Sequence, residues 1–159
     1  MTTLDTLYPG GAGYHRAHEA YIQAVYDAFA AADVPVRDWH ADPNDPRDGA
    51  IEFDVKWVWD ESGRPVWSHD EVWAGWSEDR GWHLLTIDDP DGRDSRFVYG
   101  LPIARLASPE TVVRAVADEA GVPVDVLADG FEDADFPEHT FEDDDPAFEL
   151  ALAVYREAS

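Results

Sequence analysis

The stretch WSEDRGWHLLTI, residues 76–87, decides the fold. Its first part, residues 77–81, is rich in turn-forming residues, and residues 82–87 carry apolar side chains on both faces of a strand. A strand of this kind usually lies in the middle of a sheet that is covered on both sides. Because the turn is short, we expect the strand before it to be an antiparallel neighbour. The two faces carry Trp82 and Leu84 on one side, and Leu85 and Ile87 on the other.

Three further strands are predicted around this one, over residues 51–59, 66–76 and 96–101. The first alternates apolar with polar residues, which places Trp57 and Trp59 on its apolar face. We therefore expect both indoles to lie in the core. Residues 38–49 contain Pro43, Pro46 and several aspartates, and this composition predicts a loop.

Helices are predicted on either side of the strands. Apolar residues recur at three- and four-residue steps over residues 14–32. Ser108 and Pro109 are typical of a helix start, and Gly121 is typical of a helix end. A last helix should begin at Asp145-Pro146, with Phe148, Leu152 and Tyr155 on one face.

The sequence thus predicts one α+β domain, a four-stranded antiparallel meander sheet flanked by N-terminal and C-terminal helices. We expect a flexible lead-in over residues 1–13, a core domain over 14–121, and an acidic extension over 122–159 that docks on the core. The phenylalanines of this extension should cover the second face of the sheet, while its acids face outward. They are Phe131, Phe136, Phe141 and Phe148.

Charge restricts the partners more than any motif does. The chain has 35 Asp and Glu residues against 11 Lys and Arg, a formal net charge of −24. Such a surface repels nucleic-acid phosphates and anionic lipids, and it favours a basic protein or a salt-rich solvent. The 159 residues contain no cysteine, no secretory leader pattern and no apolar run of the ~18 residues that a membrane helix needs. We therefore expect a cytoplasmic protein, with homo-oligomer formation left open.

Residues 21–118 resemble an uncharacterised family of small acidic actinobacterial proteins. The resemblance rests on YIQAV at 21–25, IEFD at 51–54, WSEDRGW at 76–82 and SPETVV at 108–113. It implies one compact α+β domain and carries no established activity. The acidic extension and the density of tryptophans depart from the family pattern.

Several clusters contain residue types that bind metals or transfer protons, but none has a specific spacing. We consider a solvated helix start or turn the better interpretation of each, or a surface strand for the cluster at His69, and we assign no catalytic, cofactor-binding or metal-binding residue. The clusters are His15, His18 and Glu19; His40, Asp42, Asp45 and Asp48; His69, Asp70 and Glu71; and Asp88, Asp89, Asp91 and Asp94.

The favoured function is a non-catalytic interaction protein that binds a basic protein partner, as a nucleic-acid mimic, an immunity protein or a regulator would. The alternatives are a small metal-binding protein or enzyme that uses the His/Asp clusters, and a housekeeping or oligomer-forming domain whose acidity is solvent adaptation. The indoles of Trp67 and Trp73 can either form hot spots of an interface or pack beneath the acidic extension. The expected partner-binding residues are Trp67, Trp73, Glu132, Asp133, Asp135, Glu142, Asp143 and Asp144.

A first prediction concerns salt. Because 24 net negative charges repel one another in the folded state, added NaCl should screen the repulsion and raise the Tm. Thermal unfolding between low and physiological ionic strength tests this. A Tm that does not change with salt would contradict it.

Overall fold

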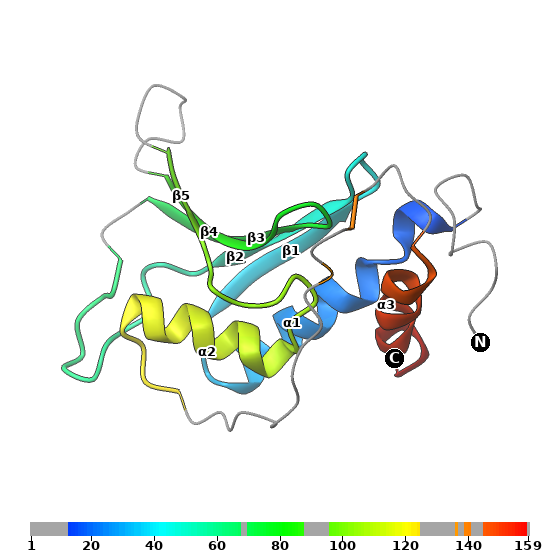
Figure 1. Ribbon diagram of the computed structural model, residues 1–159. Helices are drawn as coiled ribbons and strands as arrows, with labels where there is room; N and C mark the ends of the chain where they lie inside the picture. Colours follow the sequence, from blue (N-terminus) through cyan, green and yellow to red (C-terminus); the bar gives the residue numbers. More distant parts are fainter. Residues whose placement is uncertain are drawn as a thin grey trace.

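The computed structural model describes residues 13–67, 70–87, 96–124, 136, 139–140 and 145–158. These residues form a layer of helices against one antiparallel sheet (Figure 1). The helices are η2 (Tyr14–Arg16, a 3-10 turn), α1 (Glu19–Ala31), α2 (Pro109–Ala120) and α3 (Pro146–Ala158), and the strands are β1 (Val36–Asp42), β2 (Asp48–Phe53), β3 (Glu71–Ser77), β4 (Gly81–Ile87) and β5 (Arg96–Gly100). None of the described helices is long and apolar enough to cross a membrane.

The sheet has five strands in the order β1-β2-β3-β4-β5, with every neighbouring pair antiparallel. The α+β class, the meander and the single domain are therefore confirmed, but the predicted number of four strands is wrong. The missed strand is β1, whose residues 38–42 lie in the segment expected to be a loop. A bulge between Val36 and Asp38 shifts its register. The strand is mostly polar, and all of its residues are exposed or half-buried, so no apolar alternation indicated it.

The α1 and α2 helices lie together on one face of the sheet (Figure 1). The apolar stripe of α2 consists of Val112, Val113 and Val116, all buried. The predicted ends of α2 are also confirmed, because the Ser108 hydroxyl accepts a hydrogen bond from Thr111 N and Gly121 takes the left-handed conformation with φ 78°. Both ends are specified by local chemistry that the sequence displays.

The prediction that Trp57 and Trp59 lie in the core is wrong. Their side chains are 59% and 47% exposed, whereas Val58 between them is buried. The strand β2 ends at Phe53, and a turn follows in which Trp57 N donates to Asp54 O. The turn shifts the alternation by one residue, and a shift of one residue moves every side chain to the other face.

The final helix, α3, begins where the sequence predicted, with the Asp145 carboxylate accepting a hydrogen bond from Phe148 N. It packs beside α1 (Figure 1), and Phe148 and Leu152 are fully buried in the main core. The expectation that this helix covers the second face of the sheet is therefore wrong. Its apolar stripe extends the helical layer, where the aromatic rings of Tyr21 and Trp76 provide contacts. Phe131 and Phe141 lie outside the described residues.

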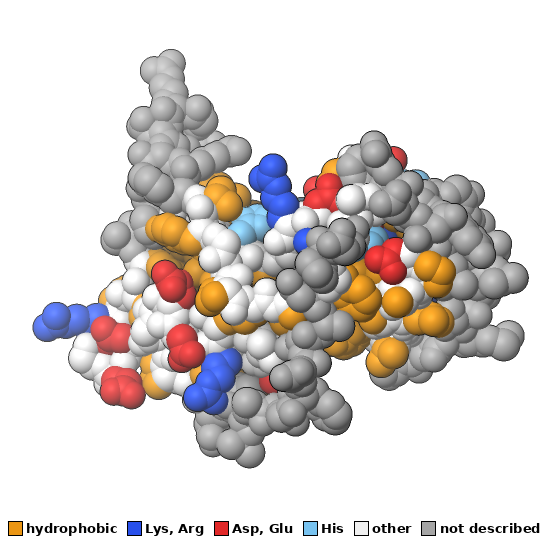
Figure 2. All heavy atoms as spheres, viewed as in Figure 1, with side chains coloured by type: hydrophobic (Ala, Val, Ile, Leu, Met, Phe, Trp, Pro, Cys, Tyr) orange, Lys and Arg blue, Asp and Glu red, His pale blue; other side chains and the backbone are white. Residues whose placement is uncertain are grey.

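Charged side chains of both signs are interspersed over the α2 side of the molecule, while hydrophobic side chains gather around α3 (Figure 2). Among the described residues on the visible face, charges of one sign are not concentrated in one place.

The core assignment gives a second prediction. Trp82 is 2% exposed and its indole N–H donates to Tyr21 Oη at 2.9 Å, so Trp82→Ala should lower the free energy of unfolding by about 3–5 kcal/mol. Trp57→Ala should change it by only about 0.5 kcal/mol. Urea unfolding of both variants measures the difference. Equal costs would show that the burial of the two indoles has been assigned wrongly.

Candidate functional site: a hollow on the open face of the sheet

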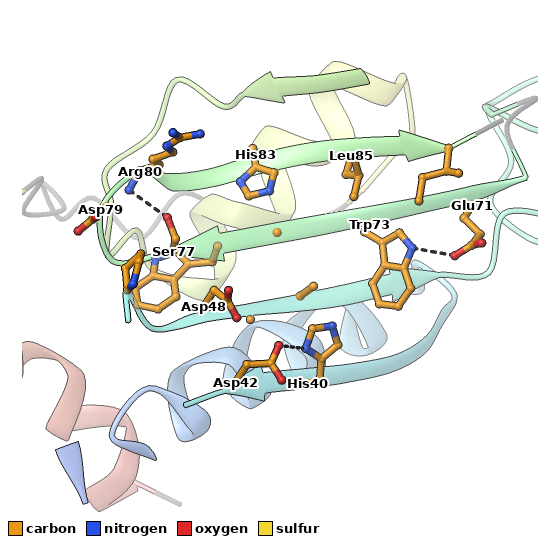
Figure 3. A pocket seen from close by; sticks show the side chains of 16 residues that line it. His40, Asp42, Asp48, Glu71, Trp73, Ser77, Asp79, Arg80, His83 and Leu85 are labelled. Carbon is orange, nitrogen blue, oxygen red and sulfur yellow. Dashed lines mark hydrogen bonds and ion pairs between the residues drawn. The ribbon is translucent and has the colours of Figure 1, made fainter. Parts of the chain in front are cut away.

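The face of the sheet opposite α1 and α2 contains a hollow of about 670 Å³. Its side chains come from four consecutive strands, β1 to β4, and point out of the sheet toward the viewer in Figure 3. The size lies within the range of small-ligand pockets. The lining side chains that matter for the chemistry of the hollow are His40, Asp42, Asp48, Glu71, Trp73 and His83.

The floor of the hollow is made by two small residues. In the ladder, Ala50 pairs with His40 on one side and with Gly75 on the other, and Gly75 pairs with His83. A Cβ atom at Gly75 would collide with the His83 imidazole. The imidazole therefore lies low against the sheet, and only glycine leaves room for it. Small side chains in the middle and larger ones around them produce the concave shape.

The walls are held by hydrogen bonds within the site. His40 Nδ1 lies 2.8 Å from Asp42 Oδ2, and Trp73 Nε1 donates to Glu71 Oε1 at 3.1 Å (Figure 3). The rings of His40 and Trp73 meet edge to face with centroids 5.8 Å apart. The indole is thus fixed with its polar N–H already bonded, and its apolar ring borders the hollow.

Burial shifts the pKa values of groups on this face. Burial, together with the neighbouring carboxyl of Asp42, raises the pKa of Asp48, and burial also raises the pKa of Glu52. Burial lowers the pKa of His83, so its imidazole is held neutral. Each shift reports a polar group that has been partly removed from water.

The His40–Asp42 pair resembles a general base with its orienting carboxylate. The hydroxyl that lines the same hollow belongs to Ser77, which accepts a hydrogen bond from Arg80 N at 3.1 Å. His40 is on β1 and Ser77 on β3, with β2 between them. Neighbouring strands are ~4.8 Å apart, and Ser77 lies two residues of ~3.3 Å each beyond Gly75, the residue level with His40, so these two side chains start about 12 Å apart. The arrangement does not bring this base to this hydroxyl.

A buried ion cluster fixes the acidic end of the hollow. Arg47, the residue before Asp48, is fully buried and binds two carboxylates. Its Nε and Nη2 atoms donate to Glu78 at 2.8 and 2.9 Å, and its Nη1 and Nη2 atoms donate to Glu149 of α3 at 2.8 and 2.7 Å. His18 Nε2 lies 2.8 Å from the carbonyl oxygen of Asp48. The backbone at the start of β2 is therefore held from several directions.

The same cluster continues into the C-terminal segment. His139 lies between two carboxylates, with Nε2 2.9 Å from Glu78 Oε1 and Nδ1 2.9 Å from Asp145 Oδ2. Burial alone would raise the pKa of Glu78, but the hydrogen bonds with His139 and Arg47 outweigh it and hold this pKa at about 2. Burial would lower the pKa of His139, but its bonds to Glu78 and Asp145 raise it.

The structure separates the expected partner-binding residues. Trp73 lines the hollow, with the indole partly exposed. Trp67 packs on Phe53 with ring centroids 5.2 Å apart, against the main core. The six acidic residues expected to bind the partner lie outside the described residues. They are Glu132, Asp133, Asp135, Glu142, Asp143 and Asp144.

The structure also separates members of the candidate metal-binding clusters from one another. His15 pairs with Asp45 at 2.8 Å, whereas His18 is buried and stacks on Trp76. Burial lowers the pKa of His18 to about 4. His40, Asp42 and Asp48 do meet, at the hollow. Within the described part of the chain no group of three or more His, Asp or Glu side chains has metal-binding geometry. His69 and the cluster from Asp88 to Asp94 lie outside it.

Sequence reasoning missed Arg47 and His83. Arg47 stands in a proline- and aspartate-rich segment that looks solvated, and its partners lie 31 and 102 residues away. No local pattern points to them. For His83 there was a usable signal, because residues 82–87 are apolar except His83 and Thr86. A polar residue in such a strand marks the face that a neighbouring layer does not cover.

The chain belongs to a family of unknown function, DUF6292, whose model matches residues 21–118. No curated protein and no solved structure matches it. The matched segment contains every residue that lines the hollow, but neither His139 nor Glu149.

A third prediction follows from the ion cluster. Because the folded state raises the pKa of His139, this histidine stabilises the fold fully below its unfolded pKa of ~6.5. That contribution is lost as the pH rises through the higher folded pKa. The difference in unfolding free energy between the wild type and His139→Gln should therefore shrink between pH 6 and pH 9. A difference that stays constant over this range would contradict the assigned protonation.

Proposed function

We propose that this member of DUF6292 is a non-catalytic interaction protein, and that it binds a basic protein partner through the open face of its sheet. The observation that carries the proposal is the hollow itself, which has the paired carboxylates of Asp42 and Asp48 at one end and, at the other, the Trp73 indole held in place by Glu71. Aromatic side chains beside charged groups are the usual anchors of protein interfaces.

The net charge supports the choice of partner. With a formal charge of −24, the chain attracts positively charged surfaces over a distance of about one Debye length. Nucleic-acid phosphates and anionic lipid headgroups are repelled by the same field. Long-range attraction raises the association rate, while contacts in the hollow determine which surface stays bound.

The fourth prediction tests this function. A 20-residue peptide of lysine, arginine and serine should bind the full chain, as measured by isothermal titration calorimetry. A glutamate–serine peptide of equal length should not bind. Affinity should fall as NaCl is raised from 50 to 300 mM, since the contact depends on charge.

The position of binding needs a matched control. Asp48→Asn and Asp118→Asn each remove one negative charge, but Asp48 lines the hollow and Asp118 is exposed on α2. Asp48→Asn should weaken the affinity for the basic peptide at least fivefold, and Asp118→Asn should weaken it less than twofold. Equal losses would mean that the peptide responds only to net charge, and the proposed role of the open face would then be wrong.

A further inference from the structure

We infer that the hollow is a recognition site for an arginine side chain, with the guanidinium group bound between the Trp73 ring and the Asp42–Asp48 pair. This inference rests on the proposed function and adds the chemistry of the group that is recognised. Three features of the hollow support it: the shape of its floor, the pairing of its carboxylates and the orientation of its indole.

The floor suits a flat group. Ala50 and Gly75 are cross-strand partners near the middle of the hollow, and neither has a side chain beyond a methyl group. On this face they are bordered by Trp73, one pleat away from Gly75 on the same strand, and by the low-lying imidazole of His83. A planar guanidinium can lie in such a space with its edges directed at the walls.

The carboxylates suit a forked donor. Asp42 and Asp48 are directly paired across β1 and β2, and like charges in this position repel each other. Asn44 Nδ2 donates to Asp48 Oδ2 at 3.4 Å, and His40 pairs with Asp42. Among the described residues no lysine or arginine forms an ion pair with Asp48. Guanidinium donates from two edges at once, so one group can satisfy both carboxylates, which a single ammonium does less well.

The indole provides the remaining surface. Because its N–H is already bonded to Glu71, Trp73 contributes only its ring to a ligand. Guanidinium stacks on indole rings and keeps its N–H groups free for the carboxylates. The one arginine that lines the hollow, Arg80, belongs to the turn between β3 and β4, and its side chain points away from Asp48 (Figure 3). The acidic end of the hollow is thus left to a cation from outside.

The fifth prediction compares two peptides of equal charge with the full chain. One is a capped decapeptide of alternating serine and arginine, the other of alternating serine and lysine. At a fixed 100 mM NaCl, calorimetry should give a Kd at least ten times lower for the arginine peptide. Trp73→Leu and Asp48→Asn should each reduce this ratio to about one, whereas Asp118→Asn should leave it unchanged. Circular dichroism spectra confirm that each variant is folded.

The outcomes separate the inference from the proposed function. Equal affinity for both peptides would overturn arginine recognition and leave the basic-partner function standing. An arginine preference that persists in Trp73→Leu and Asp48→Asn would place the recognition elsewhere and also overturn the inference. If neither peptide binds to the folded wild-type protein, both the function and the inference are wrong.

Discussion

The structure depends on one buried guanidinium. Arg47 is surrounded by Glu78, Glu149 and the aromatic ring of Tyr14, over which its Cζ atom lies 3.8 Å from the centroid. Removing one partner from a buried ion cluster costs several kcal/mol, because the other charges stay buried without compensation. Glu149 belongs to α3, and Glu78 is the residue that follows β3. Arg47 therefore joins the sheet to the C-terminal helix. A specific attachment of this kind fixes where α3 docks.

The two faces of the sheet have different uses. The helical face is filled by apolar side chains such as Ile51 and Leu84, whose burial provides the main driving force for folding. The other face carries imidazoles, carboxylates and one indole around a floor of small residues. The polar groups of this second face are partly buried but are not needed to close the core.

Particular residues show how far the sequence could predict this arrangement. Ser108 and Gly121 determine the ends of α2 through bonds to their own neighbours, and these signals were sufficient. The exposure of Trp57 could not be foreseen, because one turn at Asp54 reverses the alternation after Phe53. Trp73 was singled out as a candidate, but the hollow around it depends on four strands whose register no short pattern gives. Long-range pairing is a property of the whole chain.

Two pairs of carboxylates differ in whether a basic residue of the chain compensates their charge. Glu78 and Glu149 lie inside and share the charge of Arg47. Asp48, the residue after Arg47, pairs with Asp42 across β1 and β2 on the open face of the sheet, and burial already raises the pKa of Asp48. A chain with so few basic residues can bury only those acids that its own cations reach. The charge of Arg47 is taken up by Glu78 and Glu149, so the charges of Asp42 and Asp48 on the open face are left to a cation of another molecule.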